Sequence, residues 1–134
     1  MPVLLKIDTD GFDGRILRGH QAWLAAVKPV VFMEYCPDYA RTADPDIFDT
    51  FASLQKAGYQ GLVAYLNTGS YRETFLLTNA DRLRHMHETF AKPGCTAYLD
   101  LALFHTRDMD LYHQLVAWEK SGANPGTISR RQAA

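Results

Sequence analysis

Hydrophobic residues in this chain follow two spacings that alternate from one end to the other. Five continuous apolar runs have the length of buried strands, and the stretches between and after them repeat apolar residues at helical spacing. The predicted strands are 3–7, 30–35, 59–66, 71–77 and 98–105. The predicted helices are 13–27, 44–57, 79–90 and 108–120. This order predicts an α/β fold with a mostly parallel sheet, whose antiparallel edge is formed by the closing hairpin and the last strand.

Glycines and capping residues set the expected ends of the helices. Gly14 and Gly19 weaken the segment 13–27, which we expect to form two short helices. Asp44-Pro45 is a typical helix start, with an acid to cap the helix and proline at its first position. Residues 36–43 are expected to be a loop. The residues of the last helix expected to face the core are Leu111, Leu115 and Val116.

The composition is that of one ordinary globular domain. Hydrophobic residues make up 47% and charged residues 22% of the 134, and the net charge of −1 favours neither a nucleic-acid nor a membrane-surface partner. No apolar run approaches the ~20 residues of a membrane-spanning helix. Cys36 and Cys95 fit no metal-binding spacing and are expected to be free thiols. We therefore expect a cytoplasmic domain over residues 1–121, followed by a loose tail over 122–134.

Acidic residues gather where the first two predicted strands end. Asp8, Asp10 and Asp13 follow the first strand, and Glu34 lies near the end of the second. Ligands of open α/β sheets bind at the carboxyl ends of strands, so these acids mark one edge of a candidate active site. If the two strands are parallel neighbours, a strand spacing of ~4.8 Å places the Asp8 and Glu34 carboxylates within about 10 Å. Such acids raise one another's pKa values, which suits a general base near neutral pH.

The residues around these acids resemble the FkbM family of S-adenosylmethionine-dependent methyltransferases. The similar segments are Lys6-Ile7-Asp8, Asp10-Gly11-Phe12-Asp13, Leu17-Arg18-Gly19 and the strand from Pro29 to Glu34, in the same order and at the same spacing. The resemblance is specific over residues 3–35, and from there to about 105 only the order of elements is similar. It departs at positions 10 and 13, where aspartate replaces the family's usual glutamate and shortens each side chain by one methylene.

The resemblance implies a partial class I methyltransferase sheet, which is Rossmann-like, and methyl transfer from S-adenosylmethionine to an oxygen. The acceptor would be the hydroxyl of a small molecule or a glycan, and no metal is expected. The implied site residues are Asp8, Asp10 and Glu34 for catalysis, Thr9 and Gly11 on the methionine side of the cofactor, and Asp13, Tyr35 and Tyr39 on the acceptor side.

Structural roles are the alternative interpretation of several of these residues. In that interpretation Asp10 and Asp13 cap a helix, and Glu34 is only a solvated residue at a strand end. Asp8 is harder to explain in this way, because an acid that closes a buried apolar strand is costly without a purpose. His85 and His87 lie two residues apart on a predicted helix and share no face, so a solvated basic face is expected rather than a metal site.

A second family with similar residues at this position is the haloacid-dehalogenase phosphatases. Their nucleophile motif is an apolar strand followed by Asp-x-Asp-Gly, which would make Asp8 the nucleophile, Asp10 the acid/base and magnesium the cofactor. That family also needs a downstream lysine and a Gly-Asp or Asp-Asp pair. Neither pair occurs in this sequence, and Lys6 inside the strand is atypical.

The cofactor half of a class I methyltransferase sheet carries a glycine-rich turn, and this sequence contains no Gly-x-Gly. We therefore expect the chain to correspond to the carboxyl-terminal half of such a domain and to bind S-adenosylmethionine poorly alone. It is then either an enzyme completed by another half, or a non-catalytic remnant or interaction module. In both cases the strand 3–7 should present an unpaired apolar edge that favours self-association.

Overall fold

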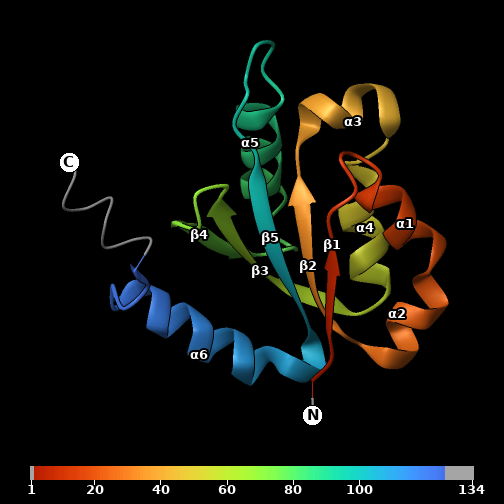
Figure 1. The fold of residues 1–134 in the computed structure, drawn as a ribbon. Helices are drawn as coiled ribbons and strands as arrows, with labels where there is room; N and C mark the ends of the chain where they lie inside the picture. The colour runs from red at the N-terminus through yellow and green to blue at the C-terminus, as the bar shows by residue number, and fades with distance from the viewer. Residues whose placement is uncertain (1, 126–134) are drawn as a thin grey trace.

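Five strands form one open sheet in the computed structural model, which describes residues 2–125 (Figure 1). Residues 126–134 of the expected tail lie outside the described residues. The strands are β1 (Leu4–Ile7), β2 (Val30–Tyr35), β3 (Tyr59–Leu66), β4 (Tyr71–Leu76) and β5 (Leu99–His105). The helices are α1 (Asp13–Gly19), α2 (Gln21–Val27), α3 (Pro37–Ala43), α4 (Asp49–Lys56), α5 (Ala80–Phe90), the short 3-10 helix η1 (Thr106–Asp108) and α6 (Met109–Lys120).

The sheet is mixed, with the strand order β1-β2-β5-β3-β4. The α/β class and the β3–β4 hairpin are confirmed, but the expectation of a mostly parallel sheet is wrong. Only β1 and β2 pair in parallel, and the other three pairings are antiparallel. β5 lies between β2 and β3 instead of at an edge. The reason is its composition, because Leu101 and Leu103 on one face and Phe104 on the other are all buried.

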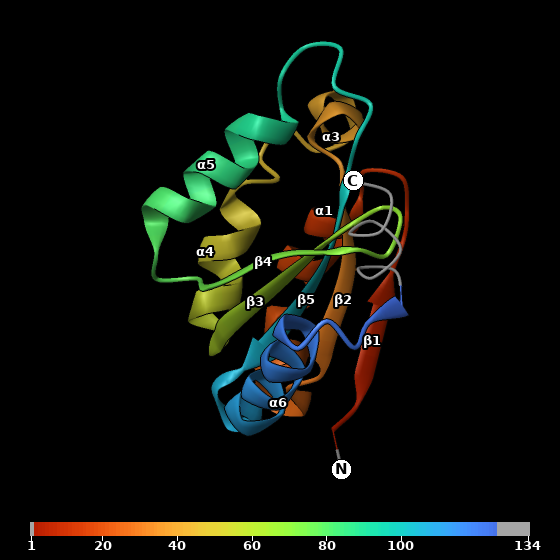
Figure 2. The ribbon, with the colours of Figure 1, turned by 90° about the vertical axis from the view of Figure 1, so that its left-hand side faces the viewer.

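Helices cover the two faces of the sheet unequally. Apolar residues of α1 to α5 join one core cluster with the face that carries Val31 and Met33. Among the helices of residues 2–125, α6 is the one that packs on the opposite face, where Tyr112 meets Ala102 and Phe104. Figures 1 and 2 show these two layers, and in Figure 1 α6 crosses the lower part of its face, away from the arrowheads of β1 and β2. Glu34 and Asp100 alternate with residues of the first core cluster, so they lie on the same face of the sheet as α6.

The segment between β2 and α4 departs most from the predicted elements. Residues 37–43, expected to be a loop, form the helix α3, which begins with Pro37 at its first position. Asp44 does not start the next helix. Its buried carboxylate accepts hydrogen bonds of 3.0 and 2.6 Å from both terminal nitrogens of Arg18, and α4 begins only at Asp49. The Asp44 side chain, which the sequence predicts to cap the next helix, therefore forms a bidentate ion pair with Arg18 of α1 instead.

Other helix predictions are confirmed with one exception. Residues 13–27 do form two helices, α1 and α2, and the side chain of Asn79 caps α5 by accepting from the backbone N–H of Arg82 at 3.2 Å. The exception is Leu111, which was expected to face the core but is 38% exposed. Tyr112 is buried instead, and its hydroxyl hydrogen-bonds the Thr74 hydroxyl at 2.7 Å.

Candidate active site at the carboxyl ends of β1 and β2

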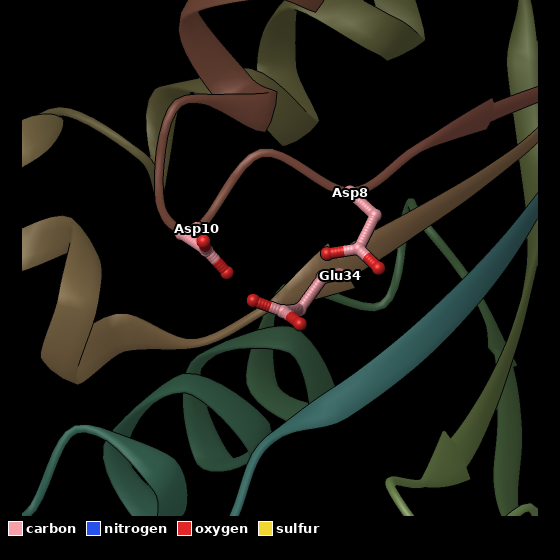
Figure 3. A group of neighbouring side chains, drawn as sticks. All are labelled: Asp8, Asp10 and Glu34. Carbon is pink, nitrogen blue, oxygen red and sulfur yellow. The ribbon is translucent and has the colours of Figure 1, made fainter.

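Three carboxylates meet where the parallel strands β1 and β2 end. Asp8 follows β1, Asp10 lies in the turn before α1, and Glu34 is the penultimate residue of β2. Each offers an oxygen atom, and these atoms all lie within 4.8 Å of one another. Figure 3 shows the three side chains pointing toward one another from these elements. The expected approach of Asp8 and Glu34 is therefore confirmed, and Asp10 belongs to the same group. These three residues are called the carboxylate cluster below.

A tight turn brings Asp10 back toward Glu34. The φ angles of Asp10 and Gly11 are +54° and +107°, so the chain reverses through two residues with positive φ. Aspartate tolerates this region better than most residues, and glycine favours it. Gly11 is buried under the α3 backbone, and a Cβ atom there would lie 3.1 Å from the carbonyl carbon and oxygen of Tyr39. The turn is thus fixed by contact with α3 as well as by its own conformation.

The buried Asp13 holds the segments that carry the cluster in place. It is 1% exposed, and its Oδ1 accepts hydrogen bonds from the backbone N–H of Thr9, at 2.9 Å, and from the Thr9 hydroxyl. Its Oδ2 accepts from the backbone N–H of Glu34 at 3.1 Å. The carboxylate therefore joins the loop after β1 to the end of β2. Asp13 does not cap its own helix, and its burial leaves no surface for the acceptor contact that the resemblance implied.

Glu34 is the electrostatically perturbed member of the cluster. Its Oε1 is buried and has no hydrogen-bond partner among the described residues. Burial raises the pKa of Glu34 from 4.5 to about 7, and the negative charge of Asp8, followed by those of Asp13 and Asp10, adds to the effect. A buried carboxylate oxygen without a donor is unfavourable when ionised. Glu34 is thus the group of this site that can take up or release a proton near neutral pH.

A fourth acid, Asp100, completes the rim and was missed in the sequence. It lies on β5 directly across from Glu34 in the antiparallel register. Burial, and after it the charge of Asp8, raises the pKa of Asp100, while Lys6 acts in the opposite direction. Asp100 alternates with Leu99 and Leu101, a pattern that indicates an outward-facing polar position. Its position opposite Glu34, however, could not be predicted, because local patterns do not indicate that β5 lies beside β2.

Two other expected site residues have structural roles. Tyr35 was expected to line the acceptor side, but it is 0% exposed and its hydroxyl hydrogen-bonds Nδ1 of His87 on α5. Burial lowers the pKa of His87, which favours the neutral form of the ring in this contact. The expectation that His87 belongs to a solvated basic face is therefore wrong. The Thr9 hydroxyl is likewise engaged by Asp13.

Tyr39 is the expected acceptor residue that does lie at an open surface. It is 53% exposed and lines a groove of about 600 Å³ together with Phe12, and Asp10 of the carboxylate cluster lines the same groove. The remaining lining comes from the same helix as Tyr39 and consists of Asp38, Thr42 and Ala43. The groove thus runs between α3 and the turn that follows β1, and it ends beside the cluster.

Comparison of the chain with protein-family models, with curated proteins and with solved structures gave no match in any of the three. Among residues 2–125, no helix is both long enough and apolar enough to cross a membrane. The chemistry of the site is therefore inferred from its own geometry. Closely spaced carboxylates with one raised pKa can remove a proton from a hydroxyl, or they can bind a cation.

Proposed function

We propose that this chain is part of an S-adenosylmethionine-dependent O-methyltransferase, in which Glu34 is the general base. The observation that carries the proposal is the carboxylate cluster at the ends of β1 and β2, with an unpartnered Glu34 oxygen and a Glu34 pKa of about 7. A general base works best when its pKa lies near the working pH. The free oxygen gives Glu34 a lone pair to receive the proton of an acceptor hydroxyl.

The other members of the cluster have supporting roles in this proposal. Burial is the main cause of the raised pKa of Glu34, and the charges of Asp8, Asp13 and Asp10 add to it. Asp13 also fixes the position of the Glu34 backbone. S-adenosylmethionine, when bound, supplies a methyl group on a positively charged sulfonium. The acidic rim fits such a cation, because opposite charges within a few ångströms attract strongly at a partly buried site. Asp100, on the neighbouring strand β5, extends the same negative rim.

In this proposal the acidic rim serves only the sulfonium end of that cofactor. In doubly wound sheets the adenosine end is held at a glycine-rich turn, and no Gly-x-Gly occurs in the sequence. β1 forms an edge of the sheet, so a further parallel strand can pair there. The proposal therefore assigns the adenosine contacts to a polypeptide segment beside β1. The antiparallel strand β5 at the far side of β2 supports placing the chain in the second half of a class I methyltransferase sheet.

A methyl-transfer assay tests this proposal. The 134-residue chain alone should give no calorimetric signal with submillimolar S-adenosylmethionine, and adding an adenosine-binding half, fused or as a separate polypeptide, should restore binding. In the completed protein, Glu34→Gln should lower turnover by about 100-fold or more while cofactor affinity stays unchanged. Glu88→Gln, on the exposed side of α5, is the matched control. Full turnover by Glu34→Gln would contradict the assignment of the base.

A second candidate function is magnesium-dependent phosphoester hydrolysis, with Asp8 as nucleophile and Asp10 as acid/base. The observation that favours it is the mutual approach of three carboxylate oxygens, the ligand type that divalent cations such as Mg²⁺ prefer. Hydrolysis of p-nitrophenyl phosphate should then require Mg²⁺ and disappear in Asp8→Asn. Methyl transfer that persists in the presence of a chelator, without such hydrolysis, favours the first candidate.

A further inference from the structure

The groove between α3 and the turn after β1 has a composition that points to a particular class of ligand. Its two largest exposed side chains are Phe12 and Tyr39, which are 46% and 53% exposed. They come from different walls, Phe12 from the turn and Tyr39 from α3. With a volume of about 600 Å³, the groove lies within the range of small-molecule sites, which is about 300–1,000 Å³.

The polar groups of the groove restrict the ligand further. Asp10 and Asp38 are carboxylates, which when ionised only accept hydrogen bonds, and Thr42 adds a hydroxyl. No basic side chain lines the groove, so it offers no cationic group to hold a phosphate or a carboxylate. A ligand must therefore bring donors, which means hydroxyl groups or an ammonium group.

The arrangement of the polar groups in the groove favours a ligand with several hydroxyl groups. Asp38 already lies 3.5 Å from the guanidinium of Arg41, so part of its charge is balanced. Asp38 and Thr42 are four residues apart on α3 and share one side of that helix, whereas Asp10 belongs to the opposite wall. The polar groups are thus distributed around the groove, as a ring with several hydroxyls requires, and two aromatic side chains can contact the apolar faces of such a ring.

We propose that this groove binds an uncharged sugar ring, and that the methyl acceptor is one of its hydroxyl groups. The assignment of the methyl acceptor rests on the proposed function. The binding of a sugar in the groove does not depend on it. Asp10 connects the two parts of the site, because it lines the groove and its carboxylate lies within 4.8 Å of the Glu34 oxygen. A hydroxyl at the Asp10 end of the groove is therefore placed beside the base that takes its proton.

Nuclear magnetic resonance titrations of the isotopically labelled 134-residue chain test the inference. The probes are methyl β-D-glucopyranoside, methyl α-D-mannopyranoside and tetramethylammonium chloride. At least one glycoside should shift the resonances of Phe12, Tyr39 and Thr42, and tetramethylammonium should not. Tyr39→Ala should weaken glycoside binding about tenfold, whereas Tyr39→Phe should keep it. Alanine retains the Cβ atom and the backbone that cover Gly11, so the turn should persist.

Two further variants separate the possible outcomes. Trp118→Ala removes an aromatic side chain that is 45% exposed on α6, away from the groove, and should bind glycosides as the wild type does. Glu88→Gln, on the exposed side of α5, should also bind them normally. If glycosides bind in this pattern but no variant or complex transfers methyl groups, only the proposed reaction fails. A shift by tetramethylammonium alone, no shift by either glycoside, or full binding by Tyr39→Ala would overturn the sugar assignment.

Discussion

Oδ2 of Asp13 accepts a hydrogen bond of 3.1 Å from the backbone N–H of Glu34. The bond joins the first turn of α1 to the end of β2, and Oδ1 of the same carboxylate holds the loop after β1 through Thr9. The position of the candidate base thus depends on a buried acid that does not itself face the site. Site geometry and fold stability are therefore linked through this one side chain.

Replacing Asp13 should destabilise the fold. Asp13→Ala leaves the backbone donors of Thr9 and Glu34 without their acceptor in a buried place, which should cost about 2–4 kcal/mol in the free energy of unfolding. Asp81→Ala is the matched control, because Asp81 also lies in the first turn of a helix but its side chain is 93% exposed. Urea unfolding of both variants gives the comparison. Equal, small losses would show that the Asp13 hydrogen bonds contribute little.

Gly11 should tolerate no side chain. Alanine at this position combines a φ of +107° with a Cβ contact of 3.1 Å to the Tyr39 backbone. Gly11→Ala should therefore lower stability by about 1–3 kcal/mol and displace the turn that carries Asp10. Gly69→Ala is a useful control, since Gly69 has a similar φ of +85° but a Cβ there meets no atom within 4 Å. A Gly11 variant no less stable than this control would mean that the contact with α3 is not limiting.

Glu34 should make the protein less stable as pH rises from about 4.5 to 7. Its pKa is near 4.5 unfolded and about 7 folded, so over this interval the folded state binds more protons and its stability falls with pH. Glu34→Gln removes this loss and should be more stable than the wild type at pH 8 by about 1 kcal/mol, after allowance for solvent screening.

The comparison between the two proteins isolates the contribution of Glu34. The lowered pKa values of His87 and His105 act in the opposite direction in both proteins and cancel in the difference. Thermal unfolding of the wild type and Glu34→Gln at pH 4.5 and 8 measures that difference. A difference that does not change with pH would show that Glu34 titrates normally.

The edge strand β1 should promote self-association. Leu4 is 66% exposed there, and apolar hollows flank the strand on both sides, one beside Trp23 of α2 and one beside Leu111 of α6. Unpaired apolar edges pair readily with other chains, and a second lysine on the edge that already carries Lys6 should oppose this pairing. Sedimentation velocity should show dimers or larger species at micromolar concentration for the wild type and fewer for Leu4→Lys. A monomeric wild type with high thermal stability would contradict this prediction.

The sequence predicts most elements of this fold because local patterns determine them. The run 30–35 is mostly apolar and begins with two β-branched valines, and it forms β2 with the expected ends. Gly14 and Gly19 interrupt a helical pattern, and the chain does turn between α1 and α2. The approach of Asp8 to Glu34 also follows from local information, because it requires only that two neighbouring strands run parallel.

The features that were missed depend on contacts between distant segments. Asp44 resembles a helix cap in sequence, but Arg18 on α1 engages its carboxylate. Tyr35 and His87 are 52 residues apart, and their pairing requires α5 to lie against β2. The same holds for Asp100, whose place opposite Glu34 follows from the insertion of β5 into the sheet. Neither periodicity nor capping signals carry information about such pairings.

The pKa of Glu34 is the most direct test of the central claim that the carboxylate cluster contains a base poised near neutral pH. Carbon-detected magnetic resonance of the glutamate side-chain carboxyl groups, with Glu34→Gln used to assign the signal, measures it in the isolated chain. We expect a value of about 7, and Asp8→Asn should lower it without returning it to 4.5, because burial is the larger cause. A Glu34 pKa near 4.5 in the folded wild type would contradict the account.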